Sequence, residues 1–302
     1  MLQKPWLYAL LAFLGGCSFG VLSTFVKIAY GHGFLPAEVV GSQFLGGTVM
    51  LWIVVLIRRK WQISLKTAGK LLLSGIPMAC SGLFYYQSLK YLDASIAIIM
   101  LFQFSWMGLF AEWILDKKIP RRPKWISAAI LFLGSLLAVN IAGSALASLS
   151  LPGVLWGLAA AVSFTTFIFA SGRVAADTDP ILKSMLMATG ALLLVSIVFP
   201  PMYLVDGTLF GGGLIRYCVI LGLFGVVLPP LLFSISMPKI GSGLGTILSA
   251  SELPTAVFMS VLFLKEQVVW MQWMGVLVVL AGISLPSLVS MYRKKYHRRE
   301  RV

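Results

Sequence analysis

The most informative chemical group in this sequence is a single carboxylate, Glu252, inside a long apolar segment. We expect a helix over residues 243–264, which places Glu252 about ten residues from either end, a depth of roughly 15 Å. An ionised carboxylate at that depth is costly unless it faces water or the interior of a helix bundle. Two roles stay open for it: binding a proton or the amine of a substrate, or acting as a structural acid held by hydrogen bonds.

Lys27 is the one cation well inside an apolar run, near the end of a helix expected over residues 7–29. Its ammonium group either snorkels to the nearer surface or acts as a gate or as the partner of a substrate carboxylate. The expected depths of Lys27 and Glu252 differ by roughly 15 Å, so no direct ion pair between them is expected.

Two further acids lie near helix ends and are expected to be structural. Glu112 comes shortly before the basic stretch 117–124, and we expect it to pair with Lys117, Lys118 or Arg121. Glu266 follows the helix of Glu252 and is expected to form hydrogen bonds at the helix end or in the loop.

Neutral polar and aromatic side chains in other apolar segments complete the candidate binding site. Such groups are well suited to ligand recognition, although hydroxyl groups also serve as packing contacts between membrane helices, and both readings stay open. The expected substrate-binding residues are Tyr85, Gln103, Trp106, Ser163, Ser251 and Glu252, and the expected coupling or gating residues are Glu252 and Lys27.

The elements that must position these groups are transmembrane helices. The 302 residues are 59% hydrophobic and 11% charged, with a mean hydropathy of +0.94, whereas soluble domains carry about 25% charged residues. Apolar runs of about 20 residues match the thickness of a bilayer. The chain is predicted to be an all-α integral membrane protein with ten transmembrane helices at about 7–29, 38–57, 70–89, 95–115, 124–141, 154–174, 182–205, 214–236, 243–264 and 271–291.

The basic residues predict the orientation of these helices. If the N-terminus is cytoplasmic, all 24 Lys and Arg residues fall inside except Lys27, Lys90, Arg216 and Lys265. The positive-inside rule then places both termini in the cytoplasm and the protein in the plasma (inner) membrane. The net charge of +14 favours contact with anionic lipid headgroups, and without a soluble domain no nucleic-acid partner is expected.

The sequence also contains an internal repeat. Leu73 and Leu221, Trp125 and Trp273, and Gly134 and Gly282 are each 148 residues apart, without a gap between 70–140 and 218–288. We expect a first five-helix repeat over 1–142, a second over 153–292, and a basic cytoplasmic tail over 293–302. Because five is an odd number, the second repeat must be inverted in the membrane. Inverted repeats are typical of secondary transporters that work by alternating access to a central site.

Several motifs resemble a known family. Lys27 is followed by Pro36, the ninth helix contains Glu252-Leu253-Pro254, and the last begins Gln272-Trp273-Met274-Gly275. In this order and spacing they resemble EamA-type, ten-helix members of the drug/metabolite transporter superfamily. The resemblance implies two bundled five-helix repeats around a central cavity that export or exchange small metabolites or amphipathic compounds.

The sequence departs from that family pattern at several positions. Gln43 stands where many members have Arg, Trp106 stands for Pro, Lys118 stands for Glu, and Lys265 stands for Gly. The departures leave the expected fold intact, but they weaken the transfer of a substrate from other members of the family.

The residues favour transport over enzymatic chemistry. With His32 in a loop and His297 in the tail as the only histidines, and without an HExxH, nucleophile-elbow, P-loop or CxxC motif, we expect no enzyme activity, no cofactor and no metal site. The expected function is export or exchange of amino acids or related metabolites. Proton antiport of lipophilic cations and a receptor or scaffold role are the alternatives. Protons are possible co-substrates, and the assembly is expected to be a monomer or weak dimer.

Overall fold

The computed structural model describes residues 5–59, 62–92, 94–117, 119–139 and 150–299. Within these ranges every regular element is helical. Lys118 and the linker residues 143–149 of the expected repeat boundary lie outside the described residues.

The first repeat begins with long helices whose ends match sequence signals. Pro36 starts α2 in the first turn, where its missing N–H is not needed. The Ser64 side chain caps α3 by accepting a hydrogen bond from the backbone N–H of Thr67 at 3.2 Å. The helices of this repeat are α1 (Pro5–Gly31), α2 (Pro36–Arg58), α3 (Leu65–Ser88), α4 (Ala94–Phe102), α5 (Phe104–Asp116) and α6 (Arg122–Ala138).

The second repeat follows the same plan. Ser150 caps α7, and the Asp179 carboxylate caps α8 by accepting from the backbone N–H of Ile181 at 3.0 Å. The α-helices are α7 (Leu151–Arg173), α8 (Pro180–Val198), α9 (Leu214–Gly222), α10 (Leu228–Ile240), α11 (Ser242–Ser249), α12 (Glu252–Met259) and α13 (Trp270–Arg299). Single turns complete it: a 3-10 turn, η2 (Met202–Leu204), and two π-helical turns, η3 (Leu223–Val227) and η4 (Ser260–Leu264).

Eight helical stretches in the described residues are long and apolar enough to cross a membrane. Helices α3 and α6 are not among them: α3 carries Lys66 and Lys70 near its start, and the described part of α6 has 17 residues. The chain is thus an all-helical integral membrane protein, and the expected number of ten transmembrane helices stays a prediction.

Some expected helices differ in detail from the observed ones. The helix expected over 182–205 ends at Val198, because Pro200 and Pro201 cannot continue it. The last helix continues to Arg299, through most of the expected tail. The fourth helix of each repeat is broken, at Gln103 in the first and at Ala250 and Ser251 in the second. Gln103 and Ser251 are 148 residues apart, so the repeats share the break.

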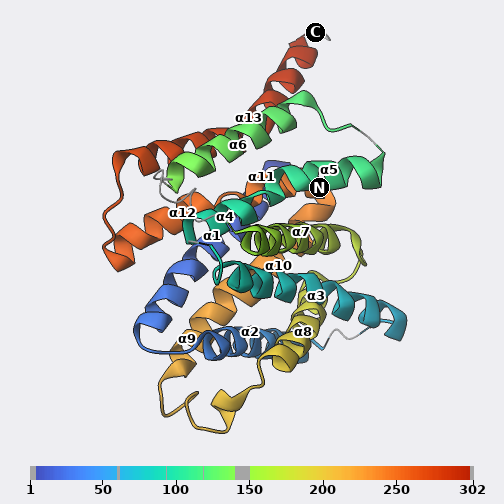
Figure 1. Ribbon diagram of the computed structural model, residues 1–302. Coiled ribbons are helices and arrows are strands. Elements are labelled where there is room, and N and C mark those ends of the chain that lie inside the picture. Colours follow the sequence, from blue (N-terminus) through green and yellow to red (C-terminus); the bar gives the residue numbers. More distant parts are fainter. Residues whose placement is uncertain (1–4, 60–61, 93, 118, 140–149, 300–302) are drawn as a thin grey trace.

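The two repeats exchange their helix contacts reciprocally. Helix α1 packs on α10 of the other repeat, and its equivalent α7 packs on α3. Helix α2 packs on its own equivalent α8, and α6 packs on α13. Figure 1 shows α6 beside α13 along one edge of the molecule and α2, α8 and α9 at the opposite edge. These exchanges are those expected for two halves related by an approximate twofold axis.

Individual contacts follow the same reciprocity. A Cβ on Gly134 of α6 would lie 2.8 Å from Cγ2 of Val279, and one on Gly282 of α13 would lie 3.1 Å from Cδ2 of Leu131. Leu131 and Val279 are again 148 residues apart. Each helix therefore inserts a branched side chain over a glycine of its partner, which brings the two backbones close together.

Helices α3 and α8 approach even more closely. A Cβ on Gly75 would collide with the Met187 carbonyl oxygen, and one on Gly190 would collide with the Leu72 carbonyl oxygen. Because each glycine has only a hydrogen atom in place of a side chain, the backbones of the two helices can come this close together.

We expect Gly75→Ala to lower stability by about 1–3 kcal/mol, because the added methyl group must push two backbones apart. Gly69→Ala on the same helix is the matched control, since nothing lies within 4 Å of its added Cβ, and alanine favours a helix. Thermal denaturation of the detergent-purified variants measures both effects. Equal melting temperatures would show that the α3–α8 contact is not tight.

Candidate functional site

A cavity of about 300 Å³ lies between α1, α2, α3, α4, α7, the π-turn η3 and the first turn of α12. Most of its wall is aromatic or aliphatic, including Phe19, Phe44, Phe164 and Phe167. The side chains with polar groups are Ser23, Lys27, Tyr30, Gln43, Ser81, Tyr85, Tyr86 and Glu252. A mostly apolar cavity with a few convergent polar groups is the usual form of a small-molecule site.

The break between α11 and α12 places Glu252 at this cavity. The Ser251 hydroxyl donates to the carbonyl oxygen of Phe13 in α1 at 2.6 Å, which ties the break to the first helix. The close approach needs two glycines of α1, because a Cβ on Gly16 would collide with Ser251 and one on Gly20 would lie 2.5 Å from the Glu252 carbonyl oxygen. Glu252 therefore begins a helix whose position is fixed by α1.

No described residue forms an ion pair or a side-chain hydrogen bond with the Glu252 carboxylate. Tyr85 lines the same cavity as Glu252. Lys27 pairs instead with Glu266, with 3.2 Å between Nζ and Oε1, in agreement with the expectation that Lys27 and Glu252 are too far apart. The carboxylate is therefore left to a ligand, water or a proton.

The structure separates the sequence-predicted site residues into two groups. Glu252, Tyr85 and Lys27 line the cavity. Gln103 and Trp106 lie at the break between α4 and α5, where Trp106 Nε1 donates to Gln103 Oε1 at 2.6 Å. These two residues, Ser163 and Ser251 are absent from the cavity lining of the described chain.

Sequence reasoning did not place Gln43, Tyr30 or Tyr86 in the site. Gln43 is a polar side chain in an otherwise apolar helix and was noted only as a departure from a family pattern. Tyr30 lies at the end of α1, where an interfacial tyrosine is common. Tyr86 follows Tyr85 directly, and their places on the wall became visible only in three dimensions.

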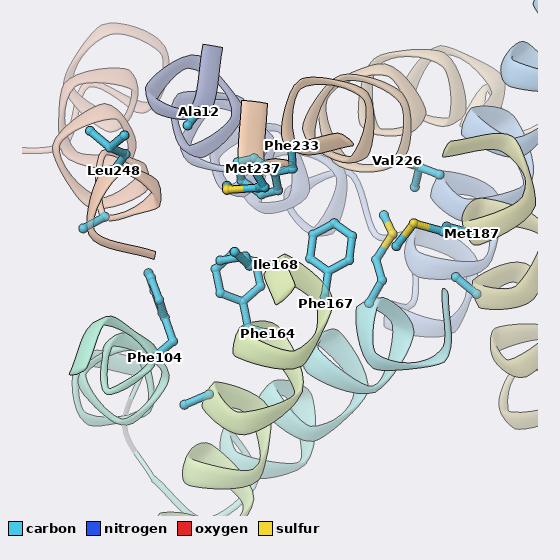
Figure 2. Close-up of a cluster of buried hydrophobic side chains, with 14 of the residues drawn as sticks. Ala12, Phe104, Phe164, Phe167, Ile168, Met187, Val226, Phe233, Met237 and Leu248 are labelled. Atoms are coloured by element: carbon cyan, nitrogen blue, oxygen red, sulfur yellow. The ribbon is translucent and has the colours of Figure 1, made fainter. Parts of the chain in front are cut away.

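An aromatic cluster closes one side of the cavity. We call Phe19, Phe104, Phe164, Phe167 and Phe233 the aromatic plug. The rings of Phe104 and Phe164 meet edge to face at 4.8 Å, and those of Phe167 and Phe233 lie 5.9 Å apart. Figure 2 shows Phe164 and Phe167 extending from α7 towards Met237 and Phe233. Beyond the plug, α7 continues through Ile168 and Ser171, which are fully buried.

Two members of the plug, Phe104 and Phe233, occupy positions that the repeat relates to residues of the cavity. A shift of 148 residues relates Glu252 to Phe104 and Tyr85 to Phe233, and both phenylalanines are fully buried. The cavity instead reaches the surface beside Lys27, whose side chain is 60% exposed. One half of an approximately symmetric molecule is thus open, and the other half is packed.

Ion pairs link the repeats at both ends of the bundle. At the end where α1 finishes, which we call the Lys27 end, the pair is Lys27–Glu266. At the opposite end, which we call the Arg173 end, Arg173 pairs with Asp116 at 2.7 Å and Arg58 with Asp179 at 3.4 Å. The Lys27–Glu266 and Arg173–Asp116 pairs are equivalent. Each one joins the last turns of the first helix of one repeat to the end of the fourth helix of the other repeat.

At the Arg173 end, Glu112 has a partner that was not expected from sequence, and the expected partner Lys118 lies outside the described residues. Glu112 is bound by Lys124, whose Nζ donates to both carboxylate oxygens at 2.7 and 2.6 Å, rather than by Lys117 or Arg121. The loop after α5 turns back at Lys117, which has a φ of 52°, and so brings the first turn of α6 over Glu112.

Comparison with known proteins agrees with this architecture. The model of the EamA-like transporter family matches twice, over residues 6–140 and 151–288. The chain belongs to the EamA-like transporter family. The two matches correspond to the two repeats whose helices exchange contacts, and they identify the chain as a membrane transporter.

One curated protein and one solved structure are similar to this chain over most of its length. The uncharacterized transporter YwfM of Bacillus subtilis (strain 168) is 23% identical over 289 residues, which cover 94% of this chain and 95% of YwfM. A solved structure described only as "Crystal structure of protein" matches with a TM-score of 0.69 at 18% identity, covering 92% of this chain and 98% of its own. The second likeness shows a shared fold.

The open and packed halves predict unequal reactivity of two related positions. In a chain whose three cysteines are replaced by alanine, we expect Tyr85→Cys to react with a small maleimide at least about tenfold faster than Phe233→Cys. Tyr85 lines the cavity, whereas Phe233 is part of the plug and fully buried. Labelling rates of the two purified variants measure the difference, and equal rates would contradict a one-sided cavity.

Proposed function

We propose that this protein is a secondary transporter of the plasma (inner) membrane that exports or exchanges small metabolites carrying an amine, such as amino acids or related compounds. Access to the cavity would alternate between the Lys27 end and the Arg173 end. The observation that carries this proposal is the unpaired Glu252 carboxylate in a cavity open to one end and packed at its repeat-related counterpart.

The surroundings of Glu252 support binding of a positively charged group. A carboxylate in an apolar cavity is stabilised by an ammonium group or a proton, and either would remove its uncompensated charge. The aromatic walls contribute favourable contacts to cations and to apolar bodies. Because ammonium and proton compete for one carboxylate, the same residue would couple substrate movement to protons.

The reciprocal packing supports alternating access. Two similar halves can exchange conformations, so that the plug opens while the counterpart around Glu252 and Tyr85 closes. In the orientation predicted by the basic residues, the Lys27 end faces outward and the Arg173 end faces the cytoplasm beside anionic lipid headgroups.

A second candidate is proton antiport of lipophilic cations. The aromatic rings around a single carboxylate favour it, because a bulky cation needs no second polar contact. A receptor or scaffold would keep the cavity but would show no substrate-dependent flux.

We expect purified protein in proteoliposomes to accumulate amines or amino acids when a pH gradient is imposed. Glu252→Gln should abolish the gradient-driven accumulation, because the amide cannot bind a proton or attract an ammonium group. Flux of a panel of amino acids and cationic dyes, with and without the gradient, measures this.

Glu112→Gln is a matched control, since Glu112 is also an acid of a broken fourth helix but is held by Lys124. Its proton coupling should be unchanged. Flux that follows only the substrate gradient and survives Glu252→Gln would make the protein a facilitator. The absence of flux for every compound would favour a receptor or scaffold.

The ion pair at the Arg173 end is expected to hold that end closed. Asp116→Asn should raise the labelling rate of Phe233→Cys about 1.4- to fivefold, because partly exposed ion pairs contribute about 0.2–1 kcal/mol. The control is Glu266→Gln, which removes the pair at the open end and should not increase labelling at Phe233→Cys. An unchanged rate in Asp116→Asn would mean that the pair does not act as a latch.

A further inference from the structure

Two glutamine side chains are almost completely buried in the described part of the chain, and their hydrogen bonding differs. Gln43 in α2 and Gln103 at the break of the fourth helix are each 8% exposed. A primary amide has two N–H donors and a carbonyl acceptor. Leaving such groups buried without partners costs about 1–3 kcal/mol.

Gln103 satisfies this requirement within the protein. Its Nε2 donates to the carbonyl oxygen of Ile99 at 2.8 Å, and its Oε1 accepts from Trp106 Nε1 at 2.6 Å. Both ends of the amide are used, away from the cavity, and its role is to hold the break.

Gln43 does not. Its side chain lines the cavity, and none of the described residues makes a hydrogen bond with either end of its amide. The amide therefore faces the cavity, which the Glu252 side chain also lines. Two polar groups of different chemistry thus reach one small, mostly apolar cavity.

A glycine next to this amide leaves room for it. Gly225 lies in the π-turn η3, and a Cβ there would be 2.5 Å from Gln43 Nε2. Within the same turn, the Phe224 carbonyl oxygen accepts a hydrogen bond from the Ser18 hydroxyl at 2.7 Å. The π-turn is therefore anchored to α1 while its glycine stays against the amide, and π-turns are frequent at functional sites.

We propose that Gln43 determines substrate specificity by binding a carbonyl oxygen of a substrate whose ammonium group is bound by Glu252. The substrate class is then a small molecule with an ammonium group and a carboxylate or amide on an apolar body. A simple amine would satisfy Glu252 but leave the Gln43 amide without a partner. This inference rests on the proposed function, since it assigns a second contact within the same cavity.

The Gln43 amide is better placed for this contact than the Lys27 ammonium group. Lys27 is paired with Glu266 and is 60% exposed at the mouth of the cavity, where water competes for any ligand. For a substrate that carries an amide, the neutral Gln43 side chain also binds the carbonyl oxygen without burying a second charge.

The test is calorimetric binding of three matched probes to the detergent-purified full chain: phenethylamine, phenylalaninamide and phenylalanine. We expect the wild-type protein to bind the two carbonyl-containing probes at least about tenfold more tightly than phenethylamine, since a site with a polar group rejects ligands that leave it unpaired.

Gln43→Met keeps the length of the side chain but removes its hydrogen bonds. It should bind phenethylamine at least as tightly as the wild type, because no amide is left unpaired, and lose the preference. Gly225→Ala should reduce the same preference by displacing the amide.

Gln103→Met is the matched control. It removes an equally buried amide that does not reach the cavity, so it should lower the melting temperature and leave the probe preference unchanged. Equal loss of affinity for all three probes in Gln43→Met, an unchanged preference, or no binding of the carbonyl-containing probes to the wild type would each overturn the proposal.

Flux measurements separate this proposal from the proposed function. Gln43-dependent preference in binding without any flux in proteoliposomes would refute transport and leave the assignment of Gln43 standing. Flux of all three probes with no effect of Gln43→Met would leave transport standing and refute the assignment.

Discussion

The site depends on one constraint, the close contact between α1 and the helix break between α11 and α12. Gly16 and Gly20 let the backbone of α1 come against Ser251 and Glu252, and the Ser251 hydroxyl bonds to the Phe13 carbonyl oxygen. The break, in turn, is what begins α12 with a carboxylate facing the cavity rather than one enclosed within a continuous helix.

The same architecture explains why the cavity is one-sided. Reciprocal helix packing gives both repeats an equivalent space beside the broken helix, but the side chains in the two spaces differ. Aromatic rings and Met237 fill one of them, whereas Tyr85, Gln43 and Glu252 border the other. Ion pairs at both ends then join the two repeats across the surface, where they add less stability than the packed plug.

The all-helical fold with two similar halves was largely predictable from sequence, because long apolar runs indicate helices and the gapless match at an offset of 148 residues indicates a repeat. The breaks at Gln103 and Ser251 were not, since one polar residue in an apolar run does not reveal whether its side chain faces a neighbouring backbone. For the site, depth alone indicated Glu252, whereas Gln43 and Gln103 look alike in sequence. Only the contacts show that one amide is satisfied and the other faces the cavity. The Glu112–Lys124 pair was missed because it depends on the path of a loop.

In the first repeat, Phe104 stands at the position equivalent to Glu252 of the second repeat. This difference between the repeats has an energetic consequence. Two identical halves related by a twofold axis would make their two access states degenerate, because exchanging the conformations of the halves would regenerate the same molecule. A carboxylate in one half and a phenyl ring in the other remove that degeneracy. In the proposed cycle, the two states therefore differ in free energy even without a gradient or ligand, and this chain has an intrinsic resting direction set by which repeat carries the charge.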